Sequence, residues 1–303
     1  MEAPARTGTP RTMHVERRAG VAFALASATG FGVMPVLTKV VYDDGVGAIG
    51  VLSVRFSAAA GVLLVLALLR GERLPRGRLL VQLALLGGVG YVVESLCYFL
   101  ALSRISAGLT ALLLYLYPAL VVLLAWALLH HRPRPRSLIC VGVATLGTAL
   151  TIGPVAGGQV VGVLLGLAGA TSYALYIVIS TAVTRGMGPL GGSAVVMGAA
   201  GLVYDVLAVA TGARLPSAPS AWLALLGVTV FGTVIAVAAF FAALSRLGPG
   251  DTAALSTFEP VVSVVAATLF LGERLSAVQL TGGALIVGAV VVLARASPEP
   301  PGL

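Results

Sequence analysis

Charged residues are scarce in this sequence. Of 303 residues only 10% are Asp, Glu, Lys or Arg, whereas 58% are hydrophobic and the mean hydropathy is +1.04. A water-soluble chain of this length could not cover its surface with so few charges. The composition therefore excludes an ordinary soluble globular protein.

Cysteines and catalytic motifs are also few. Cys97 and Cys140 both fall in apolar runs, so neither a disulfide framework nor a metal site is indicated. The chain has no GxxxxGK[ST] loop to bind nucleotide phosphates and no HExxH or GxSxG catalytic motif. We therefore expect no cofactor, no metal and no enzymatic activity.

Long apolar runs are what the sequence has in abundance. They cover roughly residues 20–41, 48–69, 80–102, 107–129, 137–153, 160–183, 190–211, 220–243, 251–271 and 277–294. A helix of about 20 apolar residues crosses a hydrocarbon core, whereas barrel strands would show alternating runs of about ten. The runs predict an all-α integral membrane protein with ten transmembrane helices.

The basic residues indicate the orientation of these helices. With the N-terminus inside, most Lys and Arg residues fall on the cytoplasmic side, as the positive-inside rule requires. The first apolar run is too long for the hydrophobic region of a cleavable signal peptide, and a largely polar tail, 1–19, precedes it. We expect this tail, like the tail 296–303, in the cytoplasm. The net charge of +8 then reflects topology and contact with lipid in the inner (plasma) membrane, not a nucleic-acid partner.

The sequence repeats itself at an offset of 142 residues. "YFLALSRISAGLTALLLYLYP" (98–118) matches "FFAALSRLGPGDTAALSTFEP" (240–260) at 10 of 21 positions. The chain thus divides into two five-helix repeats, 20–153 and 160–295. Because five is odd, the second repeat enters the membrane from the opposite side, and inverted repeats of this kind are a recurring architecture of secondary transporters.

One polar stripe stands out in the second repeat. Thr252, Ser256, Glu259 and Ser263 are spaced i, i+4, i+7 and i+11, which places them on one face of a helix. We expect this face to line a central cavity, where Glu259 can bind and release a proton and so couple export to the proton gradient. The alternative is that the hydroxyl residues allow close helix packing and that Glu259 bonds to a neighbour.

Two further charges lie inside apolar runs of the first repeat. Glu94 is flanked by Tyr91 and Tyr98 on one helix face. Arg55 lies at a similar depth, roughly 10 Å from the outer end of its helix at 1.5 Å per residue. We expect Arg55 and Glu94 to pair, either beside the substrate or only as a lock between two helices.

The sixth run offers a weaker pattern. Ser172, Tyr176 and Ser180 share one helix face. An aromatic ring beside hydroxyl groups suits an amphipathic organic substrate, although the same pattern occurs in ordinary helix packing.

Several segments resemble one family. "ALSRISAGLTALLLYLYPALVVLLA", "TAALSTFEPVVSVVAATLFLGERL" and "SVRF" (53–56), within the duplicated layout, are similar to the EamA family of the drug/metabolite transporter superfamily. The EP…LGER pattern is the most specific piece, and YP stands at the equivalent place in the first repeat. The resemblance implies a transporter, usually an exporter of amino acids, metabolites or drugs, with a central cavity between its repeats.

The expected function is secondary-active transport by alternating access, with a small organic substrate, protons and membrane lipid as partners. A passive pore or a membrane-embedded enzyme is the alternative. The sequence leaves the substrate and the oligomeric state open.

Overall fold

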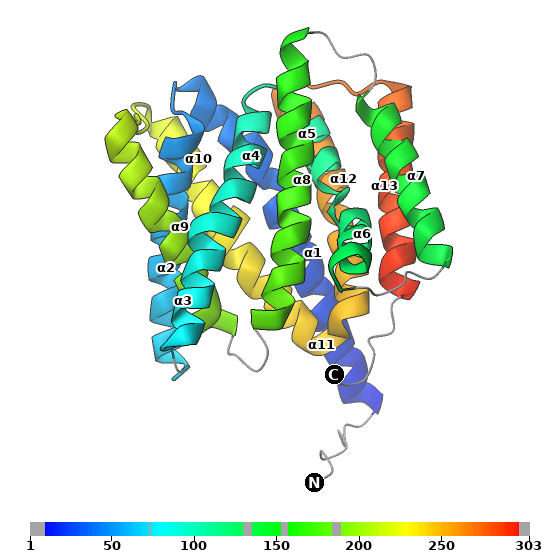
Figure 1. Cartoon of the computed structure of the whole chain (residues 1–303), viewed down its shortest axis with the longest axis horizontal. Coiled ribbons are helices and arrows are strands. Elements are labelled where there is room, and N and C mark those ends of the chain that lie inside the picture. The colour runs from blue at the N-terminus through cyan, green and yellow to red at the C-terminus, as the bar shows by residue number, and fades with distance from the viewer. Residues whose placement is uncertain (1–9, 73, 130–134, 153–156, 184–188, 297–303) are drawn as a thin grey trace.

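The structure is a computed structural model that describes residues 10–72, 74–129, 135–152, 157–183 and 189–296 (Figure 1). All regular secondary structure in these ranges is helical. The elements in chain order are α1 (Pro10–Asp43), α2 (Ala48–Leu69), α3 (Arg78–Leu85), the π-helix η1 (Leu86–Tyr91), α4 (Val92–Leu102), α5 (Ala107–Leu114), α6 (Tyr117–Leu129), α7 (Pro135–Ile152), α8 (Gly157–Val183), α9 (Pro189–Thr211), α10 (Pro219–Thr229), the π-helix η2 (Val230–Ile235), α11 (Ala236–Ser256), α12 (Phe258–Leu271) and α13 (Ala277–Ala296).

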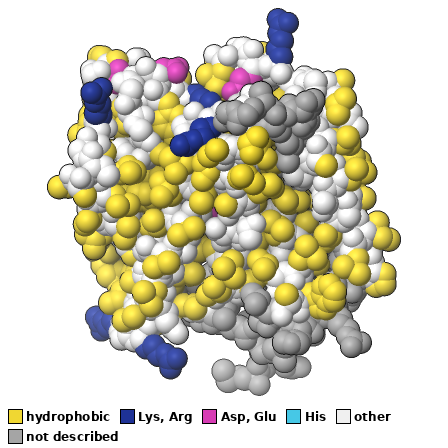
Figure 2. Space-filling model, turned by 45° about the horizontal axis from the view of Figure 1, so that its top comes forward, with side chains coloured by type: hydrophobic (Ala, Val, Ile, Leu, Met, Phe, Trp, Pro, Cys, Tyr) yellow, Lys and Arg dark blue, Asp and Glu magenta, His cyan; other side chains and the backbone are white. Residues whose placement is uncertain are grey.

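The helices form a bundle of membrane-spanning dimensions. Seven described segments are long and apolar enough to cross a membrane, and three shorter apolar helices, Leu138–Thr151, Phe258–Leu271 and Ala277–Val292, accompany them. Figure 2 shows hydrophobic side chains over the flank and Lys and Arg toward its two ends. The all-helical membrane class is confirmed, whereas the number of ten crossings stays a prediction, because three of the helices are shorter than a full crossing of about 20 residues.

Helices from the two sequence repeats pack in equivalent pairs. In Figure 1, α2 lies against α9 at one edge of the bundle and α7 against α13 at the other. Between these edges α1 packs against α11, and α8, the counterpart of α1, packs against α4. Each of these pairs joins one repeat to the other, so the core of the protein lies between the repeats.

Two close contacts show the same equivalence at atomic detail. A Cβ atom on Gly20 would lie 2.7 Å from Cγ of Leu247, and one on Gly162 would lie 2.7 Å from Cγ2 of Ile105. Gly162 follows Gly20 by 142 residues, and Leu247 follows Ile105 by the same 142. Absence of a side chain at both glycines allows each helix to approach the opposite repeat.

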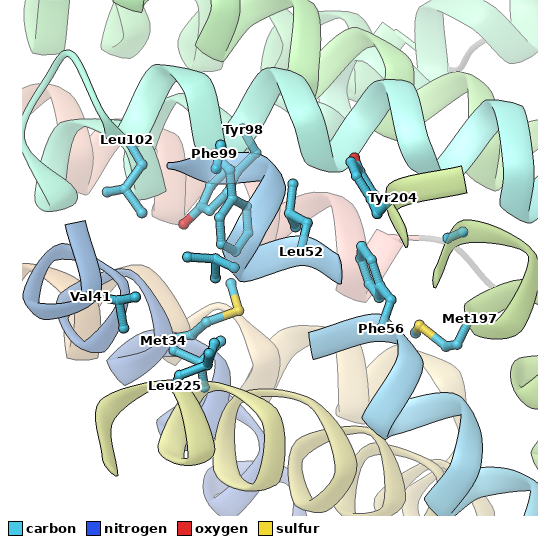
Figure 3. Close-up of a cluster of buried hydrophobic side chains, with 14 of the residues drawn as sticks. Met34, Val41, Leu52, Phe56, Tyr98, Phe99, Leu102, Met197, Tyr204 and Leu225 are labelled. Atoms are coloured by element: carbon cyan, nitrogen blue, oxygen red, sulfur yellow. The ribbon is translucent and has the colours of Figure 1, made fainter. Parts of the chain in front are cut away.

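The buried cluster in Figure 3 joins the repeats on the α2–α9 side. Phe56 stacks on Tyr204 with ring centroids 5.6 Å apart. The Tyr204 hydroxyl donates to the Val92 carbonyl at 2.8 Å and lies 2.9 Å from the Ser95 hydroxyl. The polar end of this fully buried tyrosine is thereby satisfied, and α9 is fixed against α4.

Two helices are broken at equivalent positions. The fourth apolar run divides between α5, which ends at Leu114, and α6, while α11 ends at Ser256 just before α12. Pro118 and Pro260 follow these breaks, and a proline has no N–H to donate to the carbonyl four residues earlier. Discontinuous helices near the membrane midplane commonly form the binding sites of transporters with repeats.

The end of α11 differs from the sequence prediction. The sequence places a gap between apolar runs at 244–250, whereas α11 continues from Ala236 to Ser256. In the first repeat Ser106 begins α5 by accepting a hydrogen bond from the Leu109 N–H at 3.1 Å. Gly248 stands at the equivalent position and has no side chain to start a new helix in this way.

Two π-helical segments also occupy corresponding parts of the repeats. η1 covers Leu86–Tyr91 and η2 covers Val230–Ile235. At an offset of 142 the position of Tyr91 corresponds to Thr233. π-Helical turns inside α-helices often occur at functional sites, because they rotate the following residues relative to a regular helix.

The tetrapeptide GERL occurs twice, at 71–74 and 272–275. Gly71 and Gly272 have φ angles of 67° and 64°, so each stands in the left-handed region that glycine favours after a helix. Glu72 accepts hydrogen bonds from the Leu190 and Gly191 N–H groups at 3.1 and 2.9 Å. It thereby caps the N-terminus of α9 in the opposite repeat.

The second GERL segment, which lies in the second repeat, caps a helix of the first repeat. Glu273 accepts from the Ala107 and Gly108 N–H groups at 2.8 and 3.1 Å, at the N-terminus of α5. Asp44 makes a third connection between repeats, accepting from the Ser217 N–H at 2.6 Å and its hydroxyl at 2.9 Å. The hydrogen bonds from Ser217 hold the pKa of the Asp44 carboxyl below its usual range.

Candidate functional site

A cavity of about 110 Å³ lies where the broken helices meet the π-helical segment η1. Both repeats contribute to its walls. Its lining consists of Phe31 and Met34 of α1, Arg55 of α2, Tyr91 of η1, Glu94, Ser95, Tyr98 and Phe99 of α4, Leu114 of α5, Tyr115 and Tyr117 at the α5–α6 break, Tyr173 of α8 and Glu259 of α12. Acidic, basic and aromatic groups thus converge inside the membrane-spanning bundle.

Five of the residues expected to bind substrate lie in this lining: Arg55, Tyr91, Glu94, Tyr98 and Glu259. The sequence pattern identified them because charges inside apolar runs are costly unless they face a cavity or a partner.

The other five expected residues lie outside the lining. Ser263 donates to the Gly32 carbonyl of α1 at 2.9 Å, and the Ser256 hydroxyl donates to the Thr252 carbonyl at 3.0 Å. Thr252 is buried, and Ser172 is half-buried. The ring centroid of Tyr176 lies 5.3 Å from that of Tyr91, which lines the cavity.

Arg55 is held from two directions. Its Nε donates to Thr233 Oγ1 at 2.8 Å, so the guanidinium reaches η2 of the opposite repeat. The guanidinium carbon also lies 5.0 Å from the ring centroid of Phe56 and 5.4 Å from that of Phe99. These contacts stabilise a charge that is only 4% exposed.

The expected ion pair between Arg55 and Glu94 is not formed in the described part of the chain. Glu94 is 8% exposed, and none of the described residues donates a hydrogen bond to its carboxylate. Because buried side-chain oxygens in these ranges all have partners, the Glu94 carboxylate must instead open into the cavity. Arg55 and Glu94 therefore present opposite charges to one shared space.

Glu259 has a different environment from Glu94. Its Oε2 lies 2.9 Å from the Tyr115 hydroxyl, across the two helix breaks. It is half-buried, and its carboxyl group lines the cavity from the second repeat. The site thus holds one carboxylate with a phenol partner and one that lies open to a ligand.

Tyrosine rings form most of the remaining wall. The rings follow one another in a chain of contacts. The centroid distances are 6.0 Å for Tyr115–Tyr117, 4.7 Å for Tyr117–Tyr173, 6.3 Å for Tyr173–Tyr176 and 5.3 Å for Tyr176–Tyr91. Such a wall offers apolar faces to an organic molecule and hydroxyl groups to its polar parts.

Tyr115, Tyr117, Tyr173, Phe31 and Met34 were not expected in the site. The 142-residue repeat could have identified some of them. Tyr117 stands at the position equivalent to Glu259, and Tyr173 at the position equivalent to Phe31. A cavity between two related repeats is lined by equivalent positions of both. The prediction that Glu259 lines the cavity therefore also predicts Tyr117 in its wall.

Comparison with known proteins agrees with this architecture. A model of the EamA-like transporter family matches residues 18–153 and again residues 160–295. The chain is 30% identical over 244 residues to the uncharacterized inner membrane transporter YedA of Escherichia coli K12, with 79% of each chain covered. It is 26% identical over 280 residues to the uncharacterized transporter YcbK of Bacillus subtilis, covering 88% of this chain and 90% of YcbK.

A further relative and a solved structure extend the comparison. A protein of Streptantibioticus cattleyicolor named a probable terminal-alkyne amino-acid exporter is 28% identical over 267 residues, covering 83% of this chain and 86% of the relative. One crystal structure has a TM-score of 0.65 at 21% identity, covering 91% of this chain and 96% of the other, and shows a shared fold. The two matches to the family model together span most of the sequence, and the chain belongs to the EamA-like transporter family.

Proposed function

We propose that the protein is a secondary-active transporter that exports a small organic molecule by alternating access of its two repeats around the cavity. The observation that carries the proposal is the cavity itself, which lies at the paired helix breaks and is lined by charged groups from both repeats. Transporters built from inverted repeats bind substrate at such breaks, and the repeats rock about the bound molecule.

The paired structural features support an inverted repeat of two five-helix units, 20–153 and 160–295. The helix breaks, the π-helical segments and the glycine contacts of Gly20 and Gly162 all recur at or near an offset of 142 residues. In this proposal the three shorter apolar helices complete ten crossings.

The charges in the cavity indicate the kind of substrate. Two carboxylates, Glu94 and Glu259, face one guanidinium, that of Arg55, within a wall of tyrosine rings. An amino group on an organic body matches the excess of carboxylates, and aromatic rings also attract cations. The volume is below the range of about 300–1,000 Å³ typical of drug-sized pockets, which favours a small metabolite such as an amino acid or a related amine.

The expected residues take two roles in this proposal. Arg55, Tyr91, Glu94, Tyr98 and Glu259 contact the substrate. The others support the wall from behind: Ser172, Tyr176, Thr252, Ser256 and Ser263.

The proposed orientation places both termini in the cytoplasm, with the protein in the inner (plasma) membrane. In Figure 1, α1 begins and α13 ends at the same end of the bundle, which supports termini on one side. Reporter fusions after Arg295 and in the 154–159 segment should then report opposite sides of the membrane. Identical reports from the two fusions would refute the inverted ten-helix arrangement.

Transport can be tested before the substrate is identified. Metabolites of cells with and without the protein are compared, and the compound that accumulates on deletion is labelled and loaded into proteoliposomes. A carrier should show saturable uptake and counterflow, in which unlabelled compound on one side drives labelled compound against its gradient. Flux that rises linearly with concentration would indicate a passive pore, and chemical conversion of the compound would indicate an enzyme.

A further inference from the structure

The Tyr115 hydroxyl lies between two acceptors. Its oxygen is 2.5 Å from the Ser256 carbonyl oxygen and 2.9 Å from Oε2 of Glu259. Tyr115 stands at the break between α5 and α6, whereas the two acceptors flank the break between α11 and α12. One phenol from the first repeat therefore contacts both sides of the break in the second.

The Ser256 carbonyl needs a donor that its own helix cannot supply. In a continuous helix the N–H of residue 260 would donate to it, but residue 260 is proline. Because a carbonyl inside the bundle is costly to leave without a partner, the hydrogen bond from Tyr115 satisfies the group that Pro260 leaves free. The geometry of the α11–α12 break thus depends on where the Tyr115 hydrogen points.

A phenol has a single hydrogen, so Tyr115 cannot donate fully to both acceptors. An ionised Glu259 carboxylate only accepts, and it competes with the Ser256 carbonyl through a stronger, charge-assisted hydrogen bond. A protonated Glu259 carries its own O–H, which can donate to the Tyr115 oxygen. Tyr115 then donates to Ser256, and the chain Glu259–Tyr115–Ser256 is satisfied throughout.

We propose that Tyr115 is a positioning residue that transmits the protonation of Glu259 to the α11–α12 break. The proposal rests on the proposed function, and it describes how proton binding to Glu259 is converted into a movement of the α11–α12 break. When a proton from the cavity binds Glu259, the Tyr115 hydrogen turns to Ser256 and fixes the break. When the proton leaves, the hydrogen turns to Glu259, and the Ser256 carbonyl must find another donor.

Other groups around Glu259 share the cavity. Those that titrate or carry charge are Tyr91 of η1, Tyr98 and Glu94 of α4, Tyr117 of α6, Tyr173 of α8 and Arg55 of α2, while α1 contributes the uncharged Phe31 and Met34. Among all these described residues only Tyr115 makes a side-chain hydrogen bond to Glu259. This singles out Tyr115 as the route from the carboxyl group to the helix break.

An infrared pH titration of the full chain in lipid nanodiscs, with isotopically labelled serine carbonyls and no substrate, tests the relay. In the wild-type protein, acidification should produce a carboxylic-acid band from Glu259 and, with the same midpoint, a shift of a serine carbonyl band. Tyr115→Phe keeps the ring and removes the O–H, so the carboxylic-acid band should remain and the serine shift should vanish. Tyr117→Phe, the matched control in the same cavity, should keep both signals.

A second variant keeps the test decisive if Tyr115→Phe does not fold. In Glu259→Gln the amide N–H₂ can donate to Tyr115 at every pH, so the serine band should stay at its acidic position throughout. The proposal is overturned by a serine shift that survives in Tyr115→Phe or in Glu259→Gln, by its equal loss in Tyr117→Phe, or by no Glu259-dependent signal at all. Since no substrate is present, these outcomes are independent of the counterflow result.

Discussion

Replacing Glu259 by Gln should abolish accumulation driven by a pH gradient, while the protein still folds and exchanges substrate. Gln keeps the size and hydrogen bonding of Glu but cannot bind and release a proton. For exchange of one proton per substrate, a gradient of about 1 pH unit supports an accumulation ratio of about ten. In proteoliposomes loaded with the accumulated metabolite, this ratio should fall to about one in the variant.

Two further variants show what such a result means. Glu16→Gln changes an exposed carboxylate near the start of α1, outside the cavity, and should leave the accumulation ratio unchanged. Glu259→Leu also removes the hydrogen bonding and should reduce exchange itself. Wild-type accumulation by Glu259→Gln would reject proton coupling through Glu259, and normal exchange by Glu259→Leu would show that Glu259 only packs between helices.

Arg55→Met should strongly destabilise the protein. The variant loses a hydrogen bond from a charged group to Thr233, worth about 1.5–3 kcal/mol, and contacts with two aromatic rings, worth about 0.5–2 kcal/mol each. A loss on the order of 3 kcal/mol is expected for the free energy of unfolding, measured by denaturation in mild detergent. Arg55→Lys should recover only part of it, because Lys lacks the planar guanidinium that lies over the rings.

The control for Arg55 lies on the same helix. Arg70 is exposed at the C-terminal end of α2, and Arg70→Met should change stability by less than about 0.5 kcal/mol. A similar loss of stability in both variants would show that the effect comes from removing one positive charge and not from the contacts of Arg55. Arg55 and Glu94 carry opposite charges into one cavity, so the loss of stability in the double variant Arg55→Met/Glu94→Gln should be smaller than the sum of the two single losses.

The sequence was most informative at residues whose charge is costly to bury in a membrane. Arg55, Glu94 and Glu259 are charges inside apolar runs, so each indicated a cavity or a partner, and each lies in the cavity wall. Tyr115 and Tyr173 gave no such signal, because a tyrosine is common in apolar helices. The 142-residue repeat carries a second signal, because Tyr117 and Tyr173 stand at the positions equivalent to Glu259 and Phe31.

Two expectations failed for a geometric reason. Depth along a helix placed Arg55 level with Glu94, but depth does not give the direction of a side chain around the helix axis. Arg55 points to Thr233 in the other repeat, 178 residues away. The stripe from Thr252 to Ser263 assumed one continuous helix, whereas α11 ends at Ser256, and Ser263 turns instead to α1.

The paired carboxylate caps have a consequence for how the chain is made. The first turn of α5 is complete only when Glu273 accepts the Ala107 N–H, and these two residues are 166 positions apart in the sequence. During synthesis α5 therefore enters the membrane long before the residue that caps it has left the ribosome. The Ala107 and Gly108 N–H groups must rely on water or lipid headgroups until Glu273 is inserted, so assembly of the first repeat is finished only when most of the second repeat has been made.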